Sequence, residues 1–328
     1  LQVASSAALA RKIVETNALS WLMRSTRGDI GFVDAVAEPL KFVHRADGSR
    51  VAVSDYGPAS GRPVLVVHSS LSTRPASRDL VRALQRAGYR PIAIDRPGFG
   101  MTDERPGLRP GQDPYPAAAL DALLVLDRLK LPVADLVARG AAKFVLALHA
   151  AAPSRLGRVV MVNPGLNAKE DHHRGGLFGL LKEAYARNPR MIRLWVSYLS
   201  RQITVDRHQA LVRRWVRGSA PDEAAIENPM IARDYFHAQR MFATGRVNGY
   251  VNEQSDYLRG ASPDPVPGTT EWRVLVAAHD TLHDPTAVLA FWRRIVPDAR
   301  FRMVEDAGRL LAMSHPHYVV EALVEGVA

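Results

Sequence analysis

Short apolar runs alternate with helical patterns over much of this chain, and this alternation constrains the fold more than any other feature. The run Val64-Leu-Val-Val67 is apolar throughout, which is typical of a strand buried on both faces. Further runs, each separated from the last by a helical pattern, lie at 91–95, 134–138 and 158–163. This order predicts right-handed crossovers and a mostly parallel sheet flanked by helices. A hairpin at 42–56, with Asp47-Gly48 as its turn, is expected to precede them.

The alternation stops in the middle of the chain and later resumes. Residues 166–271 show helical patterns without a convincing strand, whereas strand patterns return at 272–278 and 301–304. We therefore expect an α/β core formed by 40–165 and 272–328, with an all-helical cap or lid at 166–271. Ligands bind at the carboxyl edge of such sheets, so the cap is expected to cover the site.

Residues 1–39 are predicted to form an N-terminal arm, with a helix over 5–24. This helix could make homodimer contacts, follow an upstream domain, or pack on its own core, and the sequence leaves these choices open. Its first residues lack the charged and apolar regions of a signal peptide, and no apolar run in the chain reaches the length of a membrane span. We therefore expect a cytoplasmic protein with no membrane contact.

The chain has 328 residues, of which 47% are hydrophobic, so it can bury a large core. It has no cysteine, which excludes disulfides and thiolate metal sites. The formal net charge of +10 fits attraction to an anionic partner, or simply an arginine-rich genome. No basic run is interleaved with aromatic residues, as a single-strand nucleic-acid binder would need.

A strand–turn–helix signal occurs where the run ending at Ala138 meets a helical pattern containing Phe144, Val145 and Leu148. Such a turn is the setting of a nucleophile elbow, G-x-S-x-G, in which a strained turn lifts a serine above the sheet edge. Here the five positions read Ala138-Arg-Gly-Ala-Ala142. Gly140 stands where the serine would be, so the turn is expected without its nucleophile.

The chain at this point resembles the α/β-hydrolase fold family over about residues 40–328. The segments that carry the resemblance, in chain order, are Val64-Leu-Val-Val-His68, Ala87–Gly100, Val160-Met-Val-Asn-Pro164, Val274-Leu-Val276 and Asp306-Ala-Gly308. The resemblance implies a serine nucleophile, a histidine base and an orienting carboxylate. It also places His68-Ser69 at the oxyanion loop, where the family usually has His-Gly.

Carried over residue by residue, the resemblance implies that the catalytic positions have degenerated. Gly140 occupies the nucleophile position, and Arg309, which cannot act as a general base, occupies the histidine position. The acid position falls on Thr281, with Asp280 one residue early and Asp284 three residues late. Loss of such groups lowers turnover by about a millionfold. We therefore expect a pseudoenzyme that binds a ligand without catalysing a reaction.

The altered positions favour a mostly apolar ligand with an acidic or carbonyl end. Gly140 leaves volume at the pocket floor, a helix beginning near Ala141 offers free N–H groups, and Arg309 supplies a guanidinium suited to a carboxylate. Arg309 could instead turn outward and pair with Glu305 or Asp306. The candidate ligand-binding residues are His68, Ser69, Ser70, Gly140, Ala141, Arg309, Trp195, Tyr198 and Phe242. Arg139 is interpreted as a member of a structural ion pair.

Neither a metal site nor a cofactor site is predicted. Asp171, His172 and His173 are adjacent, so their side chains project apart and indicate a solvated loop. His279 and His283 have helical spacing but follow a strand, which favours a loop as well. No phosphate-binding loop or dinucleotide fingerprint is present.

The leading functional hypothesis is a sensory domain of a bacterial transcriptional regulator, because α/β-hydrolase-like domains are known behind helix-turn-helix domains. The stretch before the first strand is too short for such a domain, so DNA would be contacted only through a domain absent from this chain. An alternative is an active hydrolase that uses Ser69 or Ser70 as nucleophile, with His68, His279 or His283 as base. A third is a scaffold whose pocket is filled by its own side chains.

Overall fold

The computed structural model describes residues 39–108, 112–166, 188–240, 246–259, 262–266, 268 and 270–325. The chain divides into two compact units, Leu1–Ala37 and Glu38–Ala328, and every described residue belongs to the second. Several predictions fall outside the described residues: the helix over 5–24, a helix over 177–185, the loop at 171–173 and the role of Phe242.

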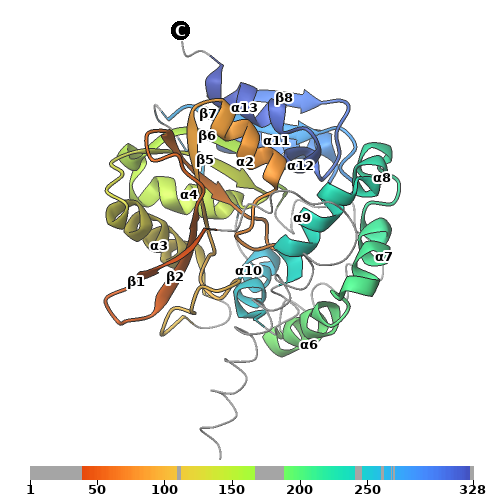
Figure 1. Cartoon of the computed structure of the whole chain (residues 1–328), viewed down its shortest axis with the longest axis horizontal. Coiled ribbons are helices and arrows are strands. Elements are labelled where there is room, and N and C mark those ends of the chain that lie inside the picture. Colours follow the sequence, from red (N-terminus) through yellow and green to blue (C-terminus); the bar gives the residue numbers. More distant parts are fainter. Residues whose placement is uncertain are drawn as a thin grey trace, which may run out of the picture. The chain divides into compact units, whose positions relative to one another are not determined.

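The core is an eight-stranded sheet in the order β1-β2-β4-β3-β5-β6-β7-β8 (Figure 1). Its strands are β1 Leu40–His44, β2 Arg50–Asp55, β3 Arg62–Val67, β4 Tyr89–Ile94, β5 Ala134–Arg139, β6 Leu156–Val162, β7 Trp272–Ala277 and β8 Arg300–Val304. The pairs β1–β2 and β2–β4 are antiparallel, and all other neighbours are parallel. The predicted mostly parallel sheet is confirmed. So is the hairpin, whose Gly48 has a φ of +80°.

The middle of the sheet is buried on both faces because its inner strands are mostly apolar. On β3, Leu65 and Val67 face one hydrophobic cluster, whereas Val64 and Val66 face the other. The first cluster is covered by α3 Tyr115–Arg128, α4 Ala142–Ala151 and α11 Pro285–Ile295. The second is covered by α2 Arg78–Arg86, α12 Leu311–Ser314 and α13 Pro316–Val324. A short 3-10 turn, η1 Pro153–Arg155, joins α4 to β6.

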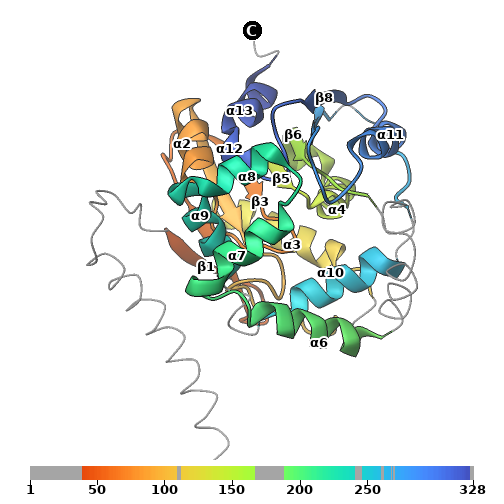
Figure 2. The ribbon, with the colours of Figure 1, turned by 90° about the vertical axis from the view of Figure 1, so that its right-hand side faces the viewer.

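Five described helices lie between β6 and β7 in the chain, and we call them the helical insert. They are α6 Pro189–Ser200, α7 Val205–Trp215, α8 Ala220–Glu227, α9 Pro229–Gln239 and α10 Asn248–Arg259, which lie beside one another in Figure 2. The sequence patterns did not indicate α8, because it has cap signals, Ser219 before it and Asp222 and Glu223 in its first turn, rather than an apolar stripe. No helix in the described part of the chain combines the length and apolarity needed to cross a bilayer.

Candidate functional site

The predicted strand–turn–helix is confirmed at the carboxyl edge of the sheet. β5 ends at Arg139, α4 begins at Ala142, and Gly140 between them has a φ of +63°. The Gly140 N–H donates to the Val162 carbonyl at 3.0 Å, which fixes the turn. A Cβ at Gly140 would meet only ordinary contacts, at 3.6 Å from the Asn163 carbonyl oxygen and the Ser69 Cβ. The position is exposed, so the turn opens onto free space where a nucleophile would stand.

The first turn of α4 is electropositive and has no side-chain cap. Its N-cap residue is Ala141, which cannot accept a hydrogen bond through its side chain. The first N–H groups of a helix have no partner within the helix, and together with the helix dipole they favour an anion.

The position that the resemblance assigned to histidine is held by the helical insert. The backbone N–H groups of Arg309 and Leu310 donate to the two carboxylate oxygens of Asp222 on α8, at 2.6 and 2.9 Å. Asp222 is fully buried, and burial raises the pKa of its carboxyl group. Gly308 is required here, because a Cβ would lie 2.3 Å from an Asp222 oxygen. This backbone contact ties α8 to the loop before α12.

The Arg309 side chain is partly exposed, and within the described residues it forms no ion pair with Glu305 or Asp306. Asp306 instead accepts a hydrogen bond from the Tyr318 hydroxyl at 3.1 Å and lies 3.8 Å from the His315 ring. The surface pair that the sequence left open for Arg309 is therefore not formed.

The carboxylates near the expected acid position have local structural roles. Asp280 accepts a hydrogen bond from the Leu282 N–H at 2.8 Å, and Asp284 caps α11 through the Thr286 N–H at 3.0 Å. His279 and Thr281 are exposed. Across the described ranges, no group of three or more histidine, aspartate or glutamate side chains is arranged to hold a metal ion.

His68 is buried and both of its ring nitrogens are occupied. Nδ1 lies 2.8 Å from the Ser69 carbonyl oxygen, and Nε2 accepts from the Arg96 N–H at 3.4 Å. Burial, and then the Arg96 guanidinium, hold the pKa of His68 well below its ordinary value, so the ring is neutral. A neutral ring with Nδ1–H donating and Nε2 accepting satisfies both contacts. His68 therefore has no free nitrogen with which to take a proton from serine.

Ser70 is bonded to a carboxylate that already has a cationic partner. Its hydroxyl donates to Glu253 on α10 at 2.8 Å, and Glu253 accepts from the Arg96 guanidinium at 2.5 and 2.9 Å. The same guanidinium donates to the His68 carbonyl oxygen. The Glu253 and Arg96 side chains are 5% and 1% exposed. This buried pair joins the insert to the loops after β3 and β4.

No hydroxyl–imidazole pair of the hydrolytic type involves Ser69 or Ser70 in the described structure. The Ser314 hydroxyl does lie 2.9 Å from Nδ1 of its neighbour His315. That hydroxyl also donates to the Leu310 carbonyl one turn earlier, at 3.2 Å, as serines inside helices commonly do. The contact belongs to α12 itself and not to the turn at Gly140.

Arg139 was expected to form a structural ion pair, and the described residues contain none. Within the described residues no carboxylate pairs with it, and its Nε atom is shut off from solvent without a hydrogen-bond partner. Burial lowers the pKa of this guanidinium, and the ionisable groups that act on it are Tyr235, Tyr56 and Arg96. Strand alternation placed this side chain on the sheet face of Val137, but nothing in the sequence showed that no acid would meet it.

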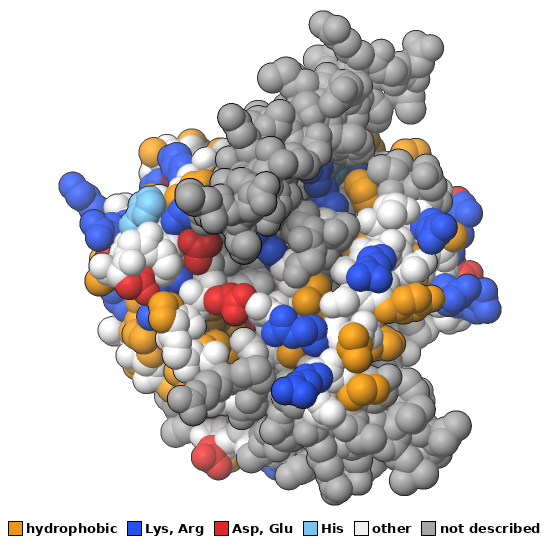
Figure 3. All heavy atoms as spheres, turned by 90° about the horizontal axis from the view of Figure 1, so that it is seen from below, with side chains coloured by type: hydrophobic (Ala, Val, Ile, Leu, Met, Phe, Trp, Pro, Cys, Tyr) orange, Lys and Arg blue, Asp and Glu red, His pale blue; other side chains and the backbone are white. Residues whose placement is uncertain are grey.

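Two of the predicted lid aromatics are far from enclosed. Trp195 and Tyr198 on α6 are 43% and 62% exposed, and Met191 and Leu194 beside them are 43% and 65% exposed. The face of the molecule seen from below shows hydrophobic side chains interspersed with lysines and arginines (Figure 3). Such exposure does not fit the expectation that Trp195 and Tyr198 line an enclosed chamber.

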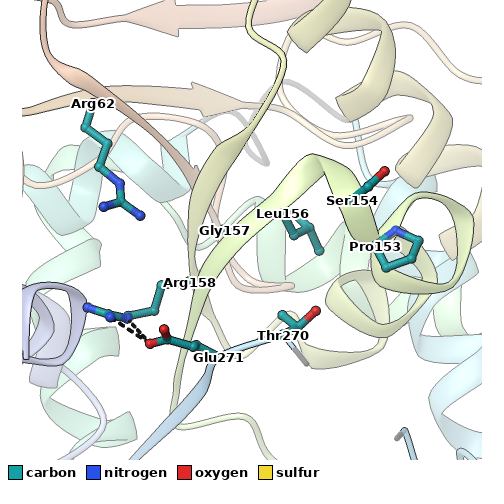
Figure 4. A pocket seen from close by; sticks show the side chains of 8 residues that line it. All are labelled: Arg62, Pro153, Ser154, Leu156, Gly157, Arg158, Thr270 and Glu271. Atoms are coloured by element: carbon teal, nitrogen blue, oxygen red, sulfur yellow. Dashed lines mark hydrogen bonds and ion pairs between the residues drawn. The ribbon is translucent and has the colours of Figure 1, made fainter. Parts of the chain in front are cut away.

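A cleft at the opposite, amino edge of the sheet is separate from these residues (Figure 4). Its lining residues are Arg62, Pro153, Ser154, Leu156, Gly157, Arg158, Thr270 and Glu271. Its arginines have carboxylate partners: Arg62 lies 2.7 Å from Asp135, and Arg158 lies 2.6 Å from Glu271. Both ion pairs are structural contacts between neighbouring strands or their ends.

Comparison with known proteins agrees with this architecture. A family model described as "alpha/beta hydrolase fold" matches residues 62–316. A probable hydrolytic enzyme from Pseudomonas aeruginosa is 18% identical with a TM-score of 0.64, covering 91% of this chain and 96% of its own. A second hydrolase from P. aeruginosa is 20% identical, with a TM-score of 0.60 and coverage of 90% and 100%. A thermophilic esterase from Thermogutta terrifontis is 19% identical, with a TM-score of 0.60 and coverage of 88% and 97%.

Proposed function

This chain belongs to the alpha/beta hydrolase fold family, and we propose that it uses the family's pocket to bind a small molecule without cutting it. The observation that carries the proposal is Gly140. It stands on the positive-φ turn between β5 and α4, with an arginine in place of the histidine. The similar solved structures named above are hydrolases or esterases, but at this low identity they support the shared fold and not a shared reaction.

The chemistry of the remaining groups supports a ligand with an acidic or carbonyl end. The uncapped start of α4 and the Arg309 side chain offer positive potential near the open turn. His68, Ser69, Ser70, Gly140, Ala141 and Arg309 remain the candidate contacts, with Ser70 held by Glu253. The setting that we propose is a sensory domain in transcriptional regulation, with DNA bound by a domain outside this sequence and the occupied pocket as the signal.

The alternative of a displaced nucleophile has little chemical support. A serine needs a base that can accept its proton, whereas both nitrogens of His68 are occupied and Glu253 is neutralised by Arg96. Ser69 and Ser70 also lie outside the turn at the start of α4, and so lack the strain that presents a nucleophile.

The proposal is tested by a sensitive hydrolysis assay with p-nitrophenyl acetate and butyrate on the full chain. We expect no turnover above buffer, and no change in Ser69→Ala or Ser70→Ala. Turnover in the wild type that disappears in either variant would replace the proposal with the hydrolase alternative.

Binding is tested in parallel by thermal shift with small aromatic and aliphatic acids and their neutral analogues. A ligand at about 100 times its Kd stabilises the folded state by roughly 2.7 kcal/mol, which is readily measured. Absence of a shift with every compound would favour a scaffold whose pocket is filled by its own side chains.

A further inference from the structure

Three arginines on the carboxyl side of the sheet, Arg74, Arg96 and Arg139, differ in whether a carboxylate pairs with them. Arg74 pairs with Asp95 at 2.8 Å, and Arg96 pairs with Glu253 at 2.5 Å. Both arginines are at most 3% exposed, and each meets a carboxylate that is equally buried. Arg139 has no such partner among the described residues, although its Nε atom is as inaccessible as theirs. The Arg139 side chain as a whole is half-buried. Because its Nε atom has no hydrogen-bond partner and no carboxylate among the described residues pairs with it, a bound anion would compensate this charge.

The groups around Arg139 cannot supply that anion. Tyr235 from α9 and Tyr56 after β2 act on it electrostatically, and burial raises the pKa of Tyr235, so this hydroxyl is uncharged at neutral pH. His68 is neutral, and Arg139 is one of the charges that lower its pKa. Arg96 adds a second positive charge nearby. None of the described groups that act on Arg139 is a carboxylate.

The opening next to Arg139 leads to solvent. Gly140 is exposed, and a Cβ there would touch nothing closer than 3.6 Å. In the chain, Gly140 lies between Arg139 and the uncapped start of α4. We expect a small anion at Gly140 to meet both the guanidinium and the first N–H groups of the helix. Arginine presents parallel N–H groups that match the two oxygens of a carboxylate.

We propose that Arg139 is the anchor for the carboxylate of a small organic acid, whose apolar part extends from Gly140 toward the helical insert. This inference rests on the proposed binding function and names the ligand class and the residue that selects it. Arg309 also has no ion pair among the described residues, and its backbone lies near the turn. Asn163 donates to the Arg309 carbonyl at 3.5 Å, and the Asn163 carbonyl oxygen would lie 3.6 Å from a Cβ at Gly140. A carboxylate neutralises one guanidinium, which is what Arg139 requires.

The first test needs no ligand. Arg139→Met keeps most of the side-chain volume and removes an uncompensated charge, so the full chain should unfold at a higher temperature than the wild type. Arg158→Met is the matched control at the other edge. It removes a guanidinium that pairs with Glu271 at 2.6 Å and donates to the Leu323 carbonyl, so its unfolding temperature should fall. A fall in both variants would show that Arg139 is structural and would overturn the inference.

The second test measures binding of octanoate and benzoate, with octanol and benzamide as neutral matches. The wild type should prefer each acid, and Arg139→Met should bind the acids about 10- to 100-fold more weakly, because hydrogen bonds to charged groups contribute about 1.5–3 kcal/mol. Arg139→Lys should restore part of the loss, and binding of the neutral compounds should not change. Inorganic phosphate should bind more weakly than either acid.

The outcomes of these tests distinguish the role of Arg139 from the proposed binding function on which it rests. Equal acid binding in wild type and Arg139→Met would overturn the anchor and leave a binding domain. Binding of the neutral compounds alone, or tighter binding of phosphate than of the acids, would overturn the carboxylate class. No binding of any compound by the wild type would overturn the binding function together with the anchor.

Discussion

The two edges of the central sheet differ in whether carboxylates pair with their arginines. At the amino edge, Arg62 pairs with Asp135, and both Arg158 and Arg273 pair with Glu271. At the carboxyl edge, Arg96 is paired but Arg139 is not. Paired charges hold strands and helices in place, whereas an unpaired buried charge weakens the fold that contains it. The amino edge therefore has the electrostatics of a framework, and the unpaired Arg139 sets the carboxyl edge apart from it.

The largest effect should come from breaking the buried pair that the carboxyl edge does contain. Arg96→Met leaves Glu253 buried without its cation, and we expect a loss of about 3–5 kcal/mol in the free energy of unfolding. Urea denaturation measures this. Arg213→Met is the control, because Arg213 pairs with Glu227 on the surface, where both side chains are more than half exposed. Equal effects of the two changes would remove the distinction between buried and surface pairs.

A smaller effect should appear in the pH dependence of stability. His237 on α9 has its pKa lowered to about 4, first by burial and then by Arg240, Arg233 and Arg78. The unfolded chain binds this proton near pH 6.5, so stability is full above that pH and is lost as the pH falls toward 4. At pH 5 the loss should approach about 2 kcal/mol, from roughly 1.4 kcal/mol per pH unit.

Urea midpoints at pH 7 and pH 5 would measure this loss, and His237→Gln should reduce it. His149 is the matched histidine near the amino edge, where its ring lies 3.1 Å from the Thr270 hydroxyl. Its pKa is lowered by burial alone, without arginines. His149→Gln should therefore change the pH dependence less than His237→Gln. The reverse order would contradict the effect that we assign to the arginines around His237.

The smallest effect is expected on the outer face of the insert. Trp195→Ser should leave octanoate binding unchanged and alter the free energy of unfolding by less than about 0.5 kcal/mol, as is usual for exposed positions. Tyr198→Ser serves as a second variant with the same expectation. Loss of octanoate binding in either variant would show that α6 contributes to the ligand pocket.

Local sequence signals predicted the framework well. Uninterrupted apolar runs such as Val64–Val67 identified the parallel strands, and Asp47-Gly48 identified the hairpin. The turn at Gly140 was visible because a strand pattern met a helix pattern there. These features depend on residues close together in the sequence, and the structure confirms them.

The site could be predicted only in part, because its electrostatics depend on distant residues. Glu253, which neutralises Arg96, is 157 positions away, and the sequence gave no reason to pair Arg96 with it while leaving Arg139 alone. The sequence also did not show which side of α6 packs against the protein. Its apolar residues cover most of the helix, and only the packing shows that Ile192 and Val196 are buried while Leu194 and Trp195 are exposed.

The ion pair between Glu253 and Arg96 also affects how a ligand can reach Gly140. If α10 moved away from the sheet, Glu253 would move with it and become exposed, and Arg96 would stay buried without its carboxylate partner. Because Gly140 is exposed, a ligand can reach this turn while α10 stays in place. We therefore expect the exchange of a ligand at Gly140 to be limited by its affinity and not by the opening of a lid.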